Sequence, residues 1–134
     1  MTDLLDTNVW ITVLRKSNPH LANRFRATAP DRIKVCSIVV AELRHGCLRS
    51  AKPEDNRAAV DALLAPITSL PFDDSAAEQF ARIRHTLEQD GRMIGPLDAQ
   101  IAAIALANHC VLVTHNSSEF SRIPTLLIED WQRT

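Results

Sequence analysis

Short apolar runs alternate along this chain with longer stretches in which apolar residues recur at helical spacing. Leu4–Leu5 and the runs at 33–36 and 110–114 predict strands, and the last, CVLVT, is typical of a parallel strand covered on both faces. Weaker extended segments are expected at 68–72 and 126–128. The pattern therefore predicts about five short strands.

Helices are predicted between these runs, from apolar spacing and from capping residues. Strands that alternate with helices imply an α/β fold, with a central, mainly parallel sheet flanked by helices, in a single domain over residues 1–134. Ligands bind such folds at the carboxyl ends of the strands. The expected helices cover 7–16, 20–27, the residues after Ser37 as N-cap, 53–65, the residues after Asp73 or Asp74, and the residues from Pro96 onward.

Composition is that of an ordinary globular protein, with 134 residues, 46% hydrophobic and 23% charged. The net charge of -1 argues against a general cationic coat, so any nucleic acid must be bound by local patches or through metal. The three cysteines form no close pair and predict reduced, buried thiols. Without a basic signal-peptide region or a membrane-length apolar run, the protein is expected in the cytoplasm and away from membranes.

Four acids occupy places where they can converge. Asp6 directly follows the first strand, and Glu119 lies just beyond the CVLVT strand. Asp98 falls in the first turn of the helix that begins at Pro96, and Glu42 lies in the apolar stretch VVAEL. We expect these four side chains to meet at one edge of the sheet.

Each acid taken alone has another explanation. Asp6 can cap the helix that begins at residue 7, Asp98 can interact with a helix dipole, and Glu119 can be a solvated loop acid. Glu42 is harder to dismiss, because a buried carboxylate needs a partner or a metal. Crowded carboxylates suit Mg²⁺, a hard cation that prefers oxygen ligands.

Polar neighbours of these acids can support the same site, because hydroxyls and amides orient carboxylates and metal-bound waters. The same residue types are also common in turns and caps. The supporting candidates are Thr7, Asn8, Thr114 and Asn116.

Taken together, four segments in register resemble the PIN-domain ribonucleases, and in particular the VapC toxins of bacterial toxin–antitoxin modules. The matching segments are LLDTNVWI at 4–11, SIVVAELRHG at 37–46, GPLDAQIAAIA at 95–105 and LVTHNSSEF at 112–120. The order and spacing agree over nearly the whole chain.

This resemblance implies endonucleolytic cleavage of RNA that depends on Mg²⁺, with Mn²⁺ as a substitute. It implies Asp6 and Asp98 as metal ligands, with Glu42 and Glu119 completing a catalytic quartet that positions the attacking water. The favoured substrate is tRNA, with the anticodon region of initiator tRNA as one option. The implied partners are a VapB-type antitoxin and a second copy of the chain in a homodimer.

One position departs from the family pattern. Many PIN domains have an aspartate where this chain has Asn116, and the nearest acid is Glu119. We therefore expect one tightly held metal, with a second metal that is weak or assisted by the substrate.

Basic side chains close to Glu42 are the best candidates to hold the RNA backbone. They are Arg44, His45 and Arg49, although such a cluster is also typical of a solvated helix face. Aromatic residues make up only 4% of the chain, so few bases can be stacked.

Three other functions remain open from the residues alone. The first is a metal-dependent nuclease with another substrate, such as ribosomal RNA or single-stranded nucleic acid. The second is a non-catalytic α/β binding module whose acids are caps and loop residues. The third is a receiver-like phosphoacceptor domain, but the paired N-terminal acids and late lysine it needs are not evident.

Overall fold

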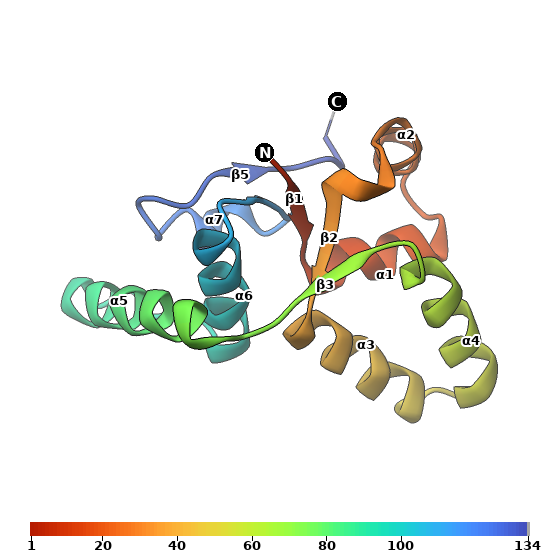
Figure 1. The fold of residues 1–134 in the computed structure, drawn as a ribbon, viewed down its shortest axis with the longest axis horizontal. Coiled ribbons are helices and arrows are strands. Elements are labelled where there is room, and N and C mark those ends of the chain that lie inside the picture. Colours follow the sequence, from red (N-terminus) through yellow and green to blue (C-terminus); the bar gives the residue numbers. More distant parts are fainter. Residues whose placement is uncertain (134) are drawn as a thin grey trace.

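The computed structural model describes residues 1–133 and has five parallel strands in the order β3-β2-β1-β4-β5. Strand β1 lies at the centre, between β2 and β4 (Figure 1). The strands are β1 (Asp3–Leu5), β2 (Ile33–Cys36), β3 (Thr68–Leu70), β4 (Val111–Val113) and β5 (Ile128–Glu129). The predicted α/β class and the predicted number of strands are confirmed, and the described sheet is entirely parallel.

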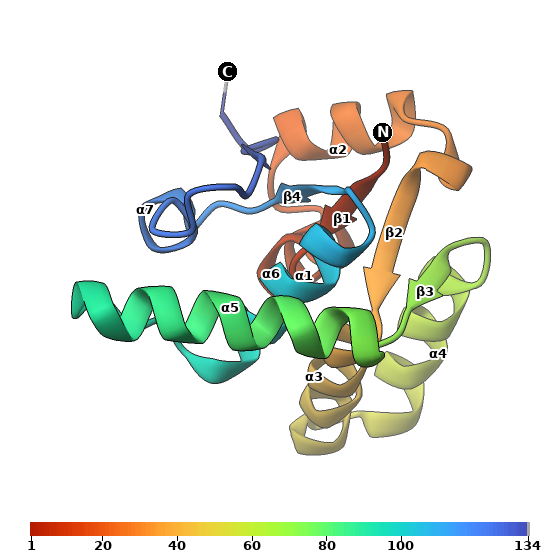
Figure 2. The same cartoon turned by 60° about the vertical axis from the view of Figure 1, so that its left-hand side comes forward.

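Seven α-helices and one 3-10 turn connect the strands within residues 1–133. Helices cover both faces of the sheet, and α3 and α4 extend beyond the carboxyl ends of β1 and β2 (Figures 1 and 2). The helices are α1 (Thr7–Arg15), α2 (Pro19–Ala27), α3 (Ser37–Arg49), α4 (Pro53–Leu64), α5 (Asp74–Asp90), α6 (Pro96–Ala107) and α7 (Ser117–Phe120), with the 3-10 turn at Pro30–Arg32.

The hydrophobic core lies between the sheet and these helices. Strands β1 and β4 are buried along their whole length, as predicted for strands that are covered on both faces. Helix α6 buries five consecutive residues from Ile101 to Ala105, so it packs on several sides. The cysteines Cys36, Cys47 and Cys110 are free and buried. Within residues 1–133, no helix has both the length and the apolar character that are needed to cross a membrane.

Two local predictions were wrong. Ser37 is the first residue of α3 rather than its N-cap, and its hydroxyl accepts the backbone N–H of Phe72 at 3.2 Å. Cys36 occupies the N-cap position, because β2 runs directly into the helix. The last strand lies at Ile128–Glu129 rather than at 126–128, and Leu126 turns into the core instead.

The sheet has a topological switch point between β1 and β4. From β1 the chain proceeds outward to β2 and β3, and then crosses back to form β4 and β5 on the other side of β1. In parallel sheets, ligands bind in the crevice that opens at the carboxyl ends of the strands at such a point. The residues after β1, the start of α6 and the segment after β4 therefore surround the expected site.

Candidate active site

Asp6 lies at the carboxyl end of the central strand and is almost completely buried, with 6% of its surface exposed. It is the N-cap of α1, and its Oδ1 accepts the N–H of Val9 at 3.0 Å. Burial raises the pKa of the Asp6 carboxyl, and the nearby charges of Glu42 and Asp130 raise that pKa further. Hydrogen bonds from Thr114 and Val9 partly offset this rise in pKa. Asp6 is therefore both a helix cap and a member of an acidic group.

Asp98 is the third residue of α6 and is partly buried. Burial raises the pKa of its carboxyl to about 6, and the charges of Glu119, Asp6 and Glu42 contribute to this rise. Its side chain accepts no hydrogen bond from residues 1–133. The structure thus brings the four predicted acids together, and the carboxylate of Asp98 remains available to a ligand.

Glu42 approaches this group from the second turn of α3. The hydroxyl of Thr7 donates a hydrogen bond of 2.6 Å to its Oε1. Because Thr7 is the first residue of α1, this bond links the start of α1 to the side of α3. The orientation of Glu42 is therefore set by a residue next to Asp6.

Glu119 comes from α7, the single turn of helix after β4. Its Oε1 accepts the backbone N–H of Gly95 at 3.3 Å, and its Oε2 accepts Nδ2 of Asn116 at 2.6 Å. Gly95 is the N-cap of α6, so Glu119 holds the residue that precedes the helix of Asp98.

The sequence matches a known family over nearly its whole length. The family model of the PIN domain matches residues 4–126. This chain belongs to the PIN-domain family. It is 35% identical to the ribonuclease VapC2 of Rickettsia felis, over 99% of this chain and 100% of that protein. It is 37% identical to the tRNA(fMet)-specific endonuclease VapC of Salmonella typhimurium, over 96% of each chain.

Solved structures of VapC proteins share the fold over nearly the full length. A complex named VapBC2 from Rickettsia felis, bound to a promoter DNA fragment, contains a chain with a TM-score of 0.91 and 35% identity, covering 98% of this chain and 99% of that one. A DNA-bound VapBC from Salmonella typhimurium gives a TM-score of 0.92 at 36% identity, over 98% of both chains. The predicted resemblance to VapC ribonucleases is confirmed.

PIN-domain nucleases in general depend on a divalent metal, and the donor set of this PIN domain fits such an ion. Four carboxylates supply the hard oxygen ligands that Mg²⁺ and Mn²⁺ prefer. Among residues 1–133, no group of three or more Asp, Glu, His or Cys side chains is placed so that it could hold a metal ion by itself. Mg²⁺ does not need one, because proteins usually hold it through one or two carboxylates and several waters.

Of the four polar residues that were predicted to support the acids, three contact an acid and one does not. The hydroxyl of Thr7 bonds to Glu42, and Thr114 is fully buried and contributes a hydrogen bond to Asp6. Asn116 donates to Glu119. Asn8 is exposed and forms no side-chain hydrogen bond with residues 1–133, so the structure does not join it to the acids.

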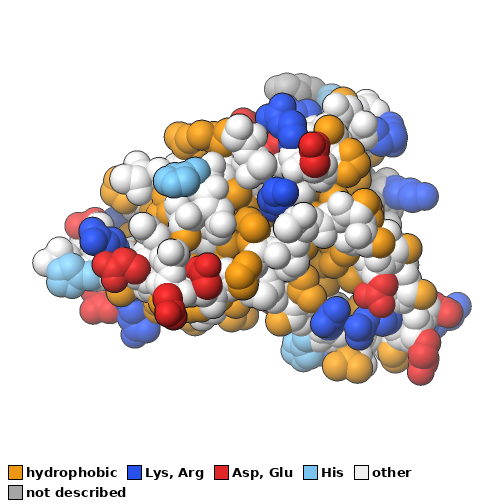
Figure 3. Space-filling view, in the orientation of Figure 1, with side chains coloured by type: hydrophobic (Ala, Val, Ile, Leu, Met, Phe, Trp, Pro, Cys, Tyr) orange, Lys and Arg blue, Asp and Glu red, His pale blue; other side chains and the backbone are white. Residues whose placement is uncertain are grey.

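The predicted basic residues of α3, namely Arg44, His45 and Arg49, are all exposed, and Arg44 and Arg49 line different hollows. Arg49 lines a hollow of about 400 Å³ together with Glu42, between α1, α3 and α4. Arg44 instead lines two other hollows, each together with Asp61 of α4. Figure 3 shows Lys and Arg side chains next to hydrophobic ones over α3 and α4. Arg49 therefore shares a hollow with Glu42, and Arg44 does not.

Asp130 is a residue of this region that the sequence analysis missed. It follows β5 and contributes to the raised pKa of Asp6. Its Oδ2 lies 2.9 Å from Nδ1 of His115 and 3.1 Å from Nε of Arg133. Asp6 was identified because it directly follows a strand. The same signal was missed for Asp130, because the last strand was predicted at the wrong residues.

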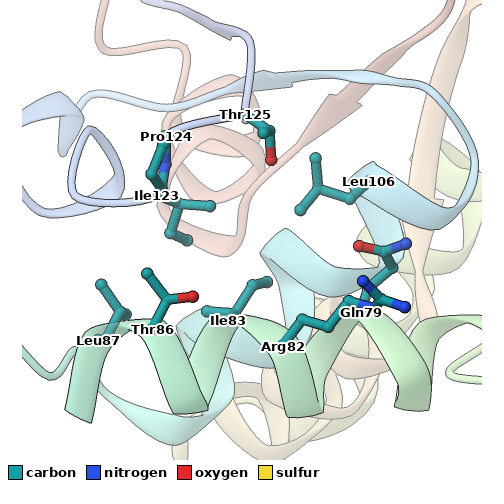
Figure 4. Close-up of a pocket in the computed structure, with 9 residues that line it drawn as sticks. All are labelled: Gln79, Arg82, Ile83, Thr86, Leu87, Leu106, Ile123, Pro124 and Thr125. Atoms are coloured by element: carbon teal, nitrogen blue, oxygen red, sulfur yellow. The ribbon is translucent and has the colours of Figure 1, made fainter. Parts of the chain in front are cut away.

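A separate hollow borders α5 and the last turn of α6. Its volume is about 310 Å³, and it opens between α5 and the segment after α7 (Figure 4). Apolar and polar side chains both line it, and none of the four acids is among them. It is lined by Gln79, Arg82, Ile83, Thr86, Leu87, Leu106, Ile123, Pro124 and Thr125.

Proposed function

We propose that this protein is a Mg²⁺-dependent endoribonuclease and the toxin of a toxin–antitoxin module. The observation that carries the proposal is the carboxyl of Asp98, whose pKa is raised to about 6 by burial and by three other acids at the switch point of the sheet. An ionised carboxylate in such surroundings lowers the stability of the folded protein unless a cation in the site neutralises it. The names of the VapC relatives supply the activity that fits this site.

The residues of the acidic group divide the work as follows. Asp6 and Asp98 would hold the cation, because Asp6 is oriented by its capping bond and Asp98 accepts no hydrogen bond from the described residues 1–133. When bound, a divalent ion neutralises the carboxylates, lowers the pKa of a water molecule and stabilises charge on the attacked phosphate. Glu42, oriented by Thr7, positions the water whose oxygen attacks phosphorus while the bond to the leaving oxygen breaks.

The proposed substrate is tRNA. One relative that covers 96% of this chain is named a tRNA(fMet)-specific endonuclease, and a second carries the same name in Shigella flexneri. Arg49 and Arg15 line the hollow next to Glu42 and are suited to hold phosphates of the RNA backbone. With a net charge of -1, the grip on RNA rests on such local contacts.

The proposed protein partner is a VapB-type antitoxin. Three of the solved relatives are VapBC complexes, two of these three are bound to DNA, and the matches cover 98%, 98% and 99% of this chain. A homodimer in the cytoplasm, where tRNA is found, completes the proposal.

The deciding experiment compares defined RNAs with the purified protein and its Asp98→Asn variant. Initiator tRNA should be cut with Mg²⁺, left intact in EDTA, and cut again when Mg²⁺ or Mn²⁺ is restored. Asp98→Asn should lower the rate at least about 100-fold without loss of folding, because it removes a charge on which the reaction depends. Equal cleavage in EDTA, or by the variant, would refute the proposal. Faster cleavage of ribosomal RNA or single-stranded DNA would show that this nucleic acid, rather than tRNA, is the substrate.

A further inference from the structure

The segment of α7 contacts the turn before α6 at two points. Arg122 donates from Nη1 to the carbonyl of Met93 at 3.0 Å, and Glu119 accepts the N–H of Gly95 at 3.3 Å. Phe120, which lies between these two residues, is buried in the core and anchors the segment. One packed segment thus holds both a carbonyl and an amide of the same turn.

The turn held in this way lies against Asp98. Gly95 is the N-cap of α6 and has no side chain to cap it, but its carbonyl accepts the N–H of Ala99 at 3.0 Å. A Cβ atom at Gly95 would stand 3.9 Å from Oδ2 of Asp98. Any displacement of Gly95 therefore moves the first turn of α6, and with it the carboxylate of Asp98.

Glu119 and Asp98 differ in what their oxygens do. Both oxygens of Glu119 already accept hydrogen bonds, one from Gly95 and one from Asn116. Asp98 accepts none from residues 1–133. Glu119 is thus engaged in holding the turn, whereas Asp98 faces the site without a partner.

Arg122 contacts the turn through a directed hydrogen bond from its guanidinium to the carbonyl of Met93. The Nε of Arg122 is buried and has no partner within residues 1–133, although such a group is costly. One donor of the guanidinium remains unsatisfied while another reaches Met93.

We propose that Glu119 and Arg122 form a bracket that positions Asp98 for the cation. In this arrangement Glu119 is a positioning residue rather than a direct metal ligand. The inference rests on the proposed function, because it assumes that Asp98 binds a divalent ion.

Arg122 gives the sharper test, because two explanations predict opposite signs. Mn²⁺ binding is measured by electron paramagnetic resonance on the protein without RNA, for wild type and Arg122→Met. Loss of the bracket should weaken binding roughly tenfold, as for other residues that orient metal ligands. Electrostatics alone predicts tighter binding, because a positive charge is removed near a cation site. Unchanged or tighter binding would overturn the bracket.

Controls exclude a general effect of removing an arginine. Arg57→Met removes a surface arginine that pairs with Asp61 on α4, and it should leave Mn²⁺ affinity unchanged. If Arg122→Met does not fold, Arg122→Gln makes the same comparison with a smaller change in polarity. If Arg57→Met weakens Mn²⁺ binding as much as the Arg122 variants do, the loss is not specific to Arg122 and the bracket is contradicted.

Glu119 is tested by comparing Glu119→Gln with Glu119→Ala. The two variants lose the same charge, but only glutamine keeps an acceptor for the amide of Gly95. The bracket predicts that Gln binds Mn²⁺ about fivefold more tightly than Ala, the equivalent of one hydrogen bond. Hydrogen exchange at the Gly95 amide should be faster in Ala than in Gln. Equal affinities and equal exchange would overturn the role assigned to Glu119.

Failure of this inference is distinguishable from failure of the proposed function. A wild-type protein that binds no Mn²⁺ and cuts no RNA would refute the proposed function and the bracket together. A wild-type protein that binds Mn²⁺ and cuts RNA, with Arg122→Met equal to it, would refute the bracket alone.

Discussion

Asp6 combines a structural and a chemical task in one side chain, and the two can be separated by substitution. Asparagine caps helices as well as aspartate does, whereas alanine does not. Asp6→Asn should therefore leave the free energy of unfolding almost unchanged but abolish RNA cleavage. Asp6→Ala should abolish cleavage and also lower stability by about 1 kcal/mol, since the bond to Val9 is lost. Urea denaturation and a cleavage assay on both variants measure this; cleavage by Asp6→Asn would show that Asp6 is only a cap.

The raised pKa of Asp98 makes the stability of the metal-free protein depend on pH. In the folded protein the pKa of the Asp98 carboxyl is about 6 instead of its ordinary 3.8, so the carboxyl keeps its proton up to about pH 6. The protonated Asp98 carboxyl contributes fully to the free energy of unfolding at pH values below its pKa in the unfolded chain. This contribution is lost as the pH rises through its folded-state pKa of about 6. Asp98→Asn should thus stabilise the metal-free protein by about 1–2 kcal/mol at pH 7.5, after allowance for solvent screening, and hardly at all near pH 4. Denaturation in EDTA at both pH values checks this; a gain independent of pH would contradict it.

The positions of individual residues could be predicted from the sequence where a residue directly follows a strand or begins a helix. Asp6 and Asp98 could be located in this way, because the position alone places the side chain at the sheet edge. Asp130 could not, because the two-residue strand before it carries little pattern. The pairing of Glu119 with Gly95 was also beyond prediction, since it joins residues 24 positions apart.

Among the elements, α1 and α3 are joined by the hydrogen bond from the hydroxyl of Thr7 to Glu42. Thr7→Val keeps the shape of the side chain but leaves Glu42 without its 2.6 Å donor. We expect RNA cleavage to fall about tenfold, in the range found for residues that orient active-site ligands. The matched control is Thr12→Val, whose hydroxyl contacts only the carbonyl of Asn8. Equal activity of both variants would show that Glu42 does not need this orientation.

The elements themselves were largely predictable, and their ends were not. Periodic apolar residues located α4, α5 and α6, because a helix that packs on a core must present such a face. The start of α3 was misread because β2 passes directly into the helix, which leaves no residue for a side-chain cap. The strand order was not predictable from pattern alone, because it depends on contacts between distant segments.

For the whole molecule, occupation of the acidic site should be linked to global stability. An ion that binds only the folded state at ten times its Kd stabilises the protein by about 1.4 kcal/mol. Mg²⁺ should therefore raise the Tm of the wild-type protein near pH 7.5 and have much less effect at pH 5, where Asp98 is largely protonated. Asp98→Asn should show little response to Mg²⁺ at either pH. Calorimetric scans with Mg²⁺ and with EDTA measure this, and an equal Mg²⁺ response in the variant would contradict it.

The position of β1 between β2 and β4 has a consequence for the order of events during synthesis. Leu4 of β1 pairs with Leu112 of β4, so the first strand waits for a neighbour that is made near the end of translation. A chain interrupted before residue 98 carries only two of the four acids, Asp6 and Glu42. On the proposed function, an unfinished chain on the ribosome therefore lacks half of the acidic group, and the nuclease becomes active only when its chain is nearly complete.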